Sequence, residues 1–469
     1  MPLGWEFFLA VGLGFLIVAL LGLLLWKPAF NLWADSFIKR IMKDPYPENL
    51  SEMYNVFAKV GIQNVIESDL RGTTGKPLQR PFGSPKHFSD WDKLTFNSVY
   101  LSRKPVMESV AINTKVVIGP NAKRPLSIDI PIVIAGMAYG AGPSLRAKIA
   151  LAKGADQENT ATNTGVGPFL PEERKHTKRL IIQYNRGYWG KEEEVLRQAD
   201  AIEIQLGYGA LGSAPRVWNY QDLSPEFRDY MKLKPGENMV EESSFPNIKC
   251  RQDLAELVEY LRKITNGAPI GVKIGATHLL EKELEIFTGA DIDFLSISGA
   301  EAGINYGPAI LADDTGLPTL AALCRSVRFL KEKRLKGKVS LIICGGLVTP
   351  GHFMKALALG ADAVAIGTIA LLVIAHTQVS KAVPWEPPTE LVYDRGKFKD
   401  RLDIDMGAKS LANYLKSCKE EIILGMRTLG KTALHELAAD DLASTSPQVA
   451  ELTGVDLNLF PPGKAGINK

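Results

Sequence analysis

The sequence predicts an α/β protein built on a (β/α)8 TIM barrel, with an N-terminal transmembrane helix, an irregular N-terminal lobe and C-terminal helices. Three observations predict this arrangement: an uncharged apolar run near the N-terminus, eight short apolar segments that alternate with helical segments, and an amphipathic pattern after them. We expect residues 1–30 to form the transmembrane anchor, 31–127 the lobe, 128–385 the barrel and 386–469 the helical extension.

The first element is the apolar run Phe7–Trp26, which carries no charged side chain. As a helix, its twenty residues would span about 30 Å, the thickness of a bilayer core. A buried core helix and a cleaved signal peptide are the alternatives, but the only charged side chain before the run is Glu6, and no small-residue cleavage site follows it. The basic residues after the run are Lys27, Lys39, Arg40 and Lys43. By the positive-inside rule we expect a single-pass protein of the cell membrane, with its catalytic domain in the cytoplasm.

The segments on either side of the barrel have different patterns. Residues 42–127 are rich in proline and turn residues, which predicts a folded but irregular lobe. Residues 411–430 have the pattern of an amphipathic helix that ends at a glycine. We expect this helix to brace the barrel.

The barrel is predicted from eight apolar segments, each followed by glycine or polar residues and most of them by a helical stretch. These segments are 131–136, 157–163, 180–185, 199–207, 269–275, 293–299, 339–346 and 363–368. They cover roughly 240 residues, the usual size of such a barrel. The alternative is a doubly wound sheet, but its G-x-G-x-x-G fingerprint is absent after the first segment. Little obvious helix joins the second segment to the third.

Composition excludes several classes of protein. The 469 residues are 46% hydrophobic and 23% charged, as in ordinary folded proteins. A formal net charge of +3 without a dense Lys/Arg block argues against a nucleic-acid partner. The four cysteines lie far apart and never form CxxC, so their spacing predicts neither a metal site nor a disulfide framework.

Two glycine-bearing turns end the last two predicted strands, at Gly345-Gly346 and at Gly367-Thr368. In barrels of this class the loops after the last two strands commonly build a phosphate site at a helix N-terminus. Glycine lets backbone amides approach an anion, so both turns are candidates for binding phosphate. The alternative is that these glycines only make tight strand-to-helix turns.

Polar residues at other strand ends are candidates for chemistry. Lys273 lies in the apolar segment GVKIG, where its charge could stabilise a reduced flavin ring or form an internal salt bridge with Glu203. Gln183 and Gln205 end the third and fourth segments. Their amides could contact a ring edge or a carboxylate, or could only cap buried backbone groups. The glycine-rich loop after the sixth segment carries Glu301.

Several motifs occur in the order in which a known family has them. They are ATNTG, QYNRGYWG, ADAIEIQLGYGA, GVKI, SISGAEAG with GLPT, and CGGLVTPGHFMKALALGADAVAIGT. Residues 80–440 thereby resemble the FMN-binding synthase domain of glutamate synthases, and the shorter glutamate-synthase-like proteins that carry this domain alone. The resemblance implies a TIM barrel that binds FMN at its mouth.

The resemblance also implies which residues would form the site, with the FMN phosphate against the two glycine-bearing turns. The implied cofactor-binding residues are Met137, Ala138, Thr164, Gln183, Lys273, Gly299, Gly303, Gly345, Gly346, Gly367 and Thr368. The implied catalytic residues are Lys273, Glu301, which stands where the family has an aspartate, and Gln205, which stands where it has a lysine.

The sequence departs from the family in three ways. Glutamate synthases carry a three-cysteine motif for an iron–sulfur cluster shortly after the eighth strand, whereas residues 373–390 contain no cysteine. We therefore expect no cluster and no other metal. Val166 replaces a family glutamate, and Tyr188 replaces a family arginine. We also expect no glutaminase domain, so this chain would not make ammonia from glutamine.

Three functions are consistent with these observations. The first is a membrane-anchored FMN-dependent oxidoreductase that acts on a small amino, imino or oxo acid and exchanges electrons with a membrane or soluble partner. The second is an ammonia-dependent glutamate synthase that uses 2-oxoglutarate and a separate electron donor. The altered Val166, Gln205 and Tyr188 count against it. The third is a non-catalytic flavoprotein that relays electrons. We favour the first.

Overall fold

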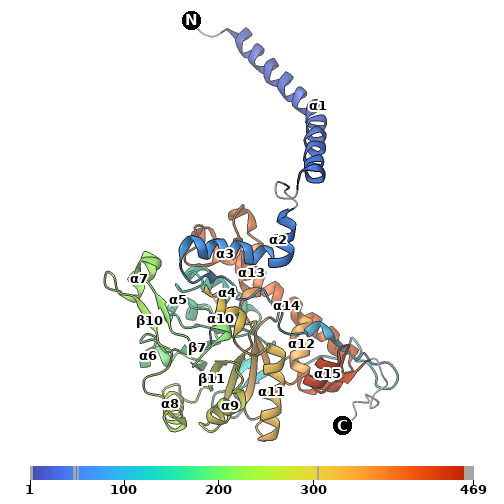
Figure 1. The fold of residues 1–469 in the computed structure, drawn as a ribbon. Coiled ribbons are helices and arrows are strands. Elements are labelled where there is room, and N and C mark those ends of the chain that lie inside the picture. The colour runs from blue at the N-terminus through green and yellow to red at the C-terminus, as the bar shows by residue number, and fades with distance from the viewer. Residues whose placement is uncertain (1–3, 46–48, 50–51, 304–305, 459–469) are drawn as a thin grey trace. The chain divides into compact units, whose positions relative to one another are not determined.

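The computed structural model describes residues 4–45, 49, 52–303 and 306–458, and it divides into two compact units, Met1–Leu78 and Gln79–Lys469. The first unit contains helices α1 (Trp5–Lys43), α2 (Glu52–Val60) and α3 (Ile62–Thr74) (Figure 1). Among the described residues, α1 is the one helix long and apolar enough to cross a membrane, and none of its residues is buried. It continues beyond the expected anchor without interruption, so residues 31–43 belong to the same helix.

The second unit is built on an eight-stranded sheet in which every neighbouring pair of strands is parallel. In chain order the strands are β5 (Ile132–Ile134), β6 (Thr162–Asn163), β7 (Leu180–Tyr184), β8 (Ala201–Gln205), β11 (Ile270–Gly275), β12 (Phe294–Ser298), β14 (Ser340–Cys344) and β15 (Ala363–Ile366). Around the sheet their order is β5-β15-β14-β12-β11-β8-β7-β6. A hydrogen bond from Ile134 N to Ala161 O, 2.9 Å long, brings the two ends of the sheet together, so the barrel is nearly closed.

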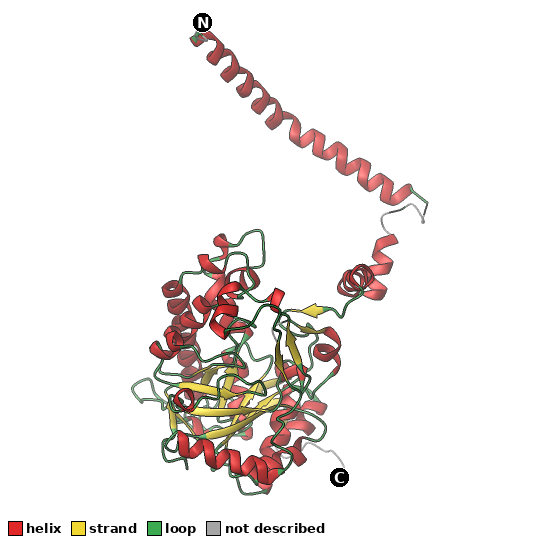
Figure 2. Ribbon diagram, turned by 90° about the vertical axis from the view of Figure 1, so that its left-hand side faces the viewer, coloured by secondary structure: helices red, strands yellow, loops and turns green. Residues whose placement is uncertain are grey.

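Helices surround the sheet, which lies at the centre of this unit (Figure 2). They are α4 (Leu145–Gln157), α5 (Pro171–Lys175), α6 (Glu193–Leu196), α7 (Pro225–Met231), α8 (Arg251–Ile264), α9 (Leu280–Thr288), α10 (Ala309–Asp314), α11 (Thr319–Glu332), α12 (Pro350–Ala358) and α13 (Thr368–His376). Side-chain caps fix where several of them begin. Ser144 accepts a hydrogen bond from Ala147 N at the start of α4, and Thr349 accepts one from His352 N at the start of α12.

The predicted fold class is confirmed, and each of the eight apolar segments contains one barrel strand. The sequence shows little helix between the second and third segments because the elements there are short. Helix α5 has five residues and strand β6 has two. The predicted C-terminal helix is α14 (Ile404–Thr428), which packs against α4, α12 and α13. It therefore covers the outer helices and not the sheet.

The barrel interior is filled by a layer of apolar side chains that come from six of the eight strands. Val133, Ile181, Ala201, Phe294, Ile342 and Ala363 belong to this layer. A hairpin of β3 (Val116–Ile118) and β4 (Leu126–Ile128) contributes four more residues to the same cluster. The barrel therefore has a packed core below its C-terminal mouth.

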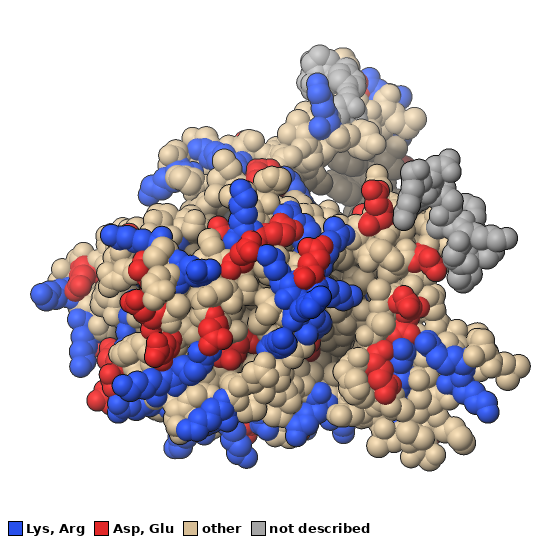
Figure 3. All heavy atoms as spheres, turned by 90° about the horizontal axis from the view of Figure 1, so that it is seen from below, with Lys and Arg blue, Asp and Glu red and all other residues tan. Residues whose placement is uncertain are grey.

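Smaller sheets complete this unit. β2 (Leu94–Phe96) pairs with β16 (Leu442–Ser444), which also pairs with β17 (Asp456–Leu457). Two further pairs of antiparallel strands lie at the barrel mouth: β1 (Gln79–Arg80) with β13 (Gly307–Pro308), and β9 (Arg216–Trp218) with β10 (Met239–Glu241). On the face seen from below, Lys and Arg side chains lie interspersed with Asp and Glu (Figure 3).

Candidate active site

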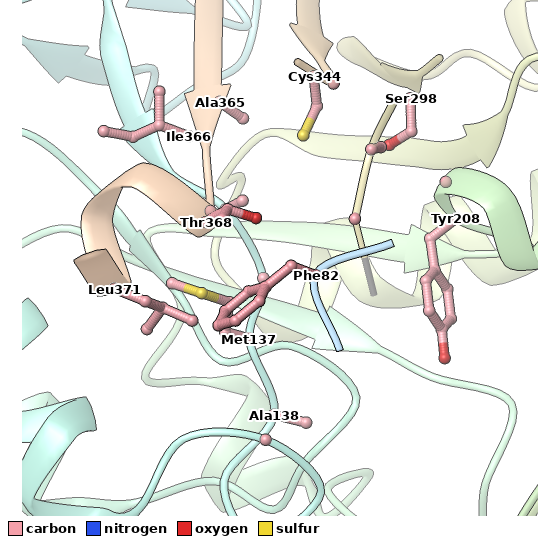
Figure 4. Close-up of a pocket in the computed structure, with 18 of the residues that line it drawn as sticks. Phe82, Met137, Ala138, Tyr208, Ser298, Cys344, Ala365, Ile366, Thr368 and Leu371 are labelled. Atoms are coloured by element: carbon pink, nitrogen blue, oxygen red, sulfur yellow. The ribbon is translucent and has the colours of Figure 1, made fainter. Parts of the chain in front are cut away.

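The C-terminal ends of the barrel strands open into a cavity of about 280 Å3, where TIM barrels bind their ligands (Figure 4). Its walls come from strand ends and from the loops that follow them. Ten of the residues singled out from the sequence line it: Met137, Ala138, Gln183, Lys273, Glu301, Gly303, Gly345, Gly346, Gly367 and Thr368. The structure thus brings together residues that are more than 200 positions apart in the chain.

At the base of the site the carboxylate of Glu203 binds three neighbours. Its Oε1 accepts hydrogen bonds from Asn163 Nδ2 at 2.9 Å and from Gln183 Nε2 at 2.7 Å. The Lys273 ammonium lies 3.8 Å from the same oxygen. These four residues are buried and stand on four adjacent strands, β6, β7, β8 and β11. Such a cluster of charges is tolerated away from water because each charge faces its partners.

Lys273 forms the predicted salt bridge, and its role toward a flavin stays a prediction. Its ammonium pairs with Glu203 inside the barrel, and the residue also lines the cavity. A cation held at this position would face any negative charge that develops on a ligand in the cavity. The pairing with Glu203 fixes the side chain before a ligand arrives.

The turn after β14 needs glycine for two reasons. Gly345 and Gly346 have φ angles of 125° and 64°, in the range that disfavours side chains. A Cβ atom at Gly345 would lie 2.5 Å from Thr319 Oγ1, and one at Gly346 would lie 2.8 Å from Glu301 Cβ. Both glycines therefore make a tight turn, and their binding of a phosphate stays a prediction. Because both residues also line the cavity, their backbone would face a ligand bound there.

The second glycine-bearing turn leads directly into α13. Gly367 precedes the helix, Thr368 is its first residue, and both line the cavity. The first backbone N–H groups of a helix have no intrahelical partner and carry a partial positive charge. This end of the cavity therefore favours an anionic group.

Glu301 has a structural role that the sequence did not predict. Its Oε2 accepts hydrogen bonds from Thr319 N at 2.8 Å and from Thr319 Oγ1 at 2.6 Å, which caps the first turn of α11. Its Oε1 is buried and has no hydrogen-bond partner within the part of the chain that the structure describes. That oxygen is available to a donor on a ligand in the cavity.

Three singled-out residues do not line the cavity. Thr164 Oγ1 accepts a hydrogen bond from Gln183 N at 3.0 Å and donates one to Gly165 O, so it joins two strand ends. Gly299 packs against the first turn of α11, where a Cβ atom would lie 2.1 Å from Thr319 Oγ1. Gln205 is fully buried on β8. A cofactor or catalytic role for these residues stays a prediction.

Sequence reasoning missed several residues of the cavity wall, namely Phe82, Tyr208, Arg216, Cys344 and Tyr393. Figure 4 shows Phe82 beside Met137 and Tyr208 on another side of the cavity. The ring of Phe82 lies 5.6 Å from that of Tyr393, so two segments outside the barrel strands cover part of the mouth. Of these five, Tyr208 and Cys344 lie within motifs that carry the family resemblance, but neither was singled out as a site residue.

Comparison with known proteins identifies the family. The pattern of the conserved region in glutamate synthase matches residues 83–432. A glutamate synthase large subunit-like protein of Rhizobium meliloti is 33% identical over 409 residues, which cover 82% of this chain and 91% of the relative. An archaeal glutamate synthase [NADPH] of Methanocaldococcus jannaschii is 30% identical over 345 residues, which cover 73% of this chain and 65% of the relative.

The chain therefore belongs to the family of proteins that carry the conserved region of glutamate synthase. Among solved structures, a flavocytochrome b2 mutant with pyruvate bound is similar with a TM-score of 0.50 and 16% sequence identity. The similarity covers 77% of this chain and 80% of that structure. At this identity the likeness concerns the fold alone.

The charge cluster at the base of the site makes a prediction about stability. Glu203→Gln keeps the shape of the side chain but leaves the Lys273 ammonium buried without its counter-charge. We expect a loss of about 3–5 kcal/mol and a lower midpoint of thermal unfolding. Lys273→Met should cost less, because Glu203 keeps two amide donors. Circular dichroism of the full chain in detergent measures both variants.

The double variant is the control for this prediction. Glu203→Gln combined with Lys273→Met removes both charges, so it should be more stable than Glu203→Gln alone. A double variant that is no more stable than Glu203→Gln would show that the two charges do not interact in the folded protein.

Proposed function

We propose that this protein is a membrane-anchored FMN-dependent oxidoreductase that acts on a small amino, imino or oxo acid. The observation that carries the proposal is the cavity itself, which joins the glycine-bearing turns at the ends of β14 and β15 to the buried lysine on β11. Membership of the glutamate synthase family supports the proposal. One solved structure of similar fold is a flavocytochrome b2 mutant with pyruvate bound.

The residues of the cavity fit FMN. The N-terminus of α13 and the Gly345-Gly346 turn would hold its phosphate with backbone N–H groups. Met137, Ala138 and Leu371 give the cavity an apolar wall suited to a flat ring (Figure 4). The unpartnered Glu301 Oε1 would accept a hydrogen bond from a hydroxyl group of the cofactor.

When bound, FMN supplies the transfer of electrons and hydride that no amino-acid side chain can perform. The chain contributes position and charge. Lys273, held by Glu203, places a positive charge in the cavity wall where it stabilises negative charge in the site. Phe82 and Tyr393 cover part of the mouth and exclude water from it.

The proposal is tested by purifying the full chain in mild detergent and measuring released flavin and iron against protein. We expect about one FMN for each chain, with negligible iron. Thr368→Asp should raise the dissociation constant of FMN at least tenfold, because a carboxylate at the first turn of α13 repels the phosphate group. Gly351→Asp is the matched control, since it adds the same charge to the first turn of α12 outside the cavity.

Either of two results would contradict the cofactor assignment. One is a chain that remains free of flavin after incubation with FMN. The other is equal affinity of the Thr368→Asp variant and the natural chain for FMN. If iron and acid-labile sulfide were instead found in stoichiometric amounts, the protein would contain an iron–sulfur cluster. This result would favour glutamate synthase chemistry.

A second candidate is ammonia-dependent glutamate synthesis, which the names of the archaeal relatives favour. In this chain Val166 lines the cavity where the family has a glutamate, so a charged group is missing there. If this candidate is right, 2-oxoglutarate with ammonium should reoxidise the reduced flavin and yield glutamate. Reoxidation by another small acid would support the first candidate. Flavin that no donor reduces would support an electron relay.

The membrane anchor is part of the proposal. Helix α1 contains an uncharged run, Phe7–Trp26, and its side chains there are exposed to the surroundings. Its 18-residue window reaches a mean hydropathy of 2.8, which suits a bilayer. Lys39, Arg40 and Lys43 near its end would face the cytoplasm.

Charges placed inside the apolar run test the anchor. The double variant Leu20→Arg/Leu24→Arg should move the protein from the membrane fraction to the soluble fraction or to aggregates, because each central arginine costs about 2.5–3.5 kcal/mol on insertion. Leu32→Arg/Ser36→Arg, with the same spacing beyond the run, should remain in the membrane fraction. Alkaline carbonate extraction followed by immunoblotting measures the distribution. If both double variants stay membrane-bound, α1 is not the anchor.

A further inference from the structure

The part of α1 that follows the apolar run has an aromatic face. On a helix of 3.6 residues per turn, Phe30, Trp33 and Phe37 fall on one side, with Ile38 and Ile41 beside them. The rings of Phe30 and Trp33 lie 5.8 Å apart, and those of Trp33 and Phe37 lie 5.6 Å apart and are stacked. All three aromatic side chains are exposed. They therefore form a continuous apolar face that the protein itself does not bury.

The opposite side of the same part of α1 is polar. Asp35, Lys39 and Lys43 lie there. Together with Arg40, residues 28–43 contain three basic side chains and one acidic side chain, a net charge of +2. Aromatic residues on one side and basic residues on the other are typical of helices that lie in the headgroup region of anionic bilayers.

Pro28 separates this part of α1 from the apolar run. A proline inside a helix has no N–H to donate to the carbonyl four positions earlier, here that of Leu24, and its ring displaces this carbonyl. Helices bend at such a residue, and α1 changes direction about midway along its length (Figure 1). Added to the usual tilt of a spanning helix, this bend turns the following residues toward the plane of the membrane.

We propose that residues 28–43 form an interfacial segment, which lies along the cytoplasmic surface of an anionic bilayer with its aromatic face toward the lipid. The face is assigned to lipid because the segment continues, within one helix, a run that the proposed function places in the bilayer. Tryptophan is enriched at the headgroup level, and basic side chains are attracted by the negative lipid surface. The inference rests on the proposed membrane anchor and adds a second membrane contact to it.

The interfacial segment decides how far from the membrane the next helix begins. Asn49 ties the following residues to the end of α1, because its Nδ2 donates hydrogen bonds to Ile41 O and, at 3.2 Å, to Asp44 O. Helix α2 begins three residues later, at Glu52. If residues 28–43 stood upright, they would lift this point about 24 Å above the bilayer. A segment that lies flat keeps the start of α2 at the lipid surface.

Fluorescent labels on the two sides of the segment test the proposal. The full-length holoprotein is reconstituted in nanodiscs of phosphatidylcholine and phosphatidylglycerol, with Cys250→Ser to remove the exposed native cysteine. Ala34→Cys then places a label on the aromatic face, and Ser36→Cys places the same label on the polar side. If the segment lies flat, the two labels differ in depth by about 10 Å, the diameter of a helix.

We expect a lipid that carries a nitroxide near its headgroup to quench the label at position 34 several-fold more than the label at position 36. Iodide in solution should show the opposite preference, because it reaches only the side that faces water. The Cys250→Ser chain without an added cysteine measures the background of labelling at the remaining native cysteines.

A pair of double variants tests whether the aromatic rings hold the segment. Trp33→Gln combined with Phe37→Gln should expose the label at position 34 to iodide, because two rings no longer favour the lipid. Leu32→Gln combined with Ser36→Gln is the matched control, with the same spacing on the polar side. This control should leave the label shielded from iodide.

Three results would overturn the proposal. Equal quenching of the two labels would describe a segment that stands upright. A label at position 34 that neither iodide nor the nitroxide lipid reaches would show that protein, such as a second copy of the chain, covers the aromatic face. Unchanged quenching in the Trp33→Gln/Phe37→Gln variant would show that the rings do not hold the segment.

The anchor and the interfacial segment can fail separately. A chain that resists alkaline carbonate extraction but shows equal quenching of the two labels would have the anchor without the segment. The opposite case is a Leu20→Arg/Leu24→Arg variant that binds nanodiscs as the natural chain does, with the label at position 34 still quenched by the nitroxide lipid. That result would refute the anchor and support the segment.

Discussion

Four neighbouring strands of the barrel meet at one carboxylate, that of Glu203. Asn163 and Gln183 donate to it, and Lys273 faces it, so strands β6, β7, β8 and β11 share one buried polar cluster just below the cavity. A buried charge that lost its partners would cost several kcal/mol, which makes this arrangement sensitive to any change in strand register. The cluster therefore sets the relative heights at which the strands present their ends to a ligand, and the shape of the cavity follows from it.

The opposite side of the cavity is shaped by close packing. Thr319, at the start of α11, leaves no room for a side chain at Gly299 or Gly345, and its backbone and hydroxyl bind Glu301. This wall of the cavity is therefore formed by glycine backbone and by the carboxylate of Glu301. One side of the site is therefore held together by an ion pair and hydrogen bonds, and the other side by close packing.

Much of this arrangement was predictable because it depends on local patterns. Eight apolar segments predicted eight strands, and an ammonium in an apolar segment predicted both the position and the partner of Lys273. Phe82 and Arg216 carried no such pattern. Each lies in or beside a short strand whose position depends on distant contacts: β1 pairs with β13, and Trp218 of β9 packs on Trp189. Thr164 was singled out through family resemblance, but here its hydroxyl satisfies backbone groups. The surroundings of Phe82, Arg216 and Thr164 depend on contacts in the folded chain, which the periodicity of the sequence does not encode.

The short strand β1 limits where the chain can be cut. Gln79 and Arg80 pair with Pro308 and Gly307, and Arg80 also binds both carboxylate oxygens of Asp313 at 2.7 Å and 3.1 Å. Phe82, two residues further on, is part of the cavity wall. A shortened form of the protein that lacks the N-terminal unit must therefore begin no later than Gln79. A protease that cleaves a few residues beyond this point would open the site while leaving every barrel strand intact.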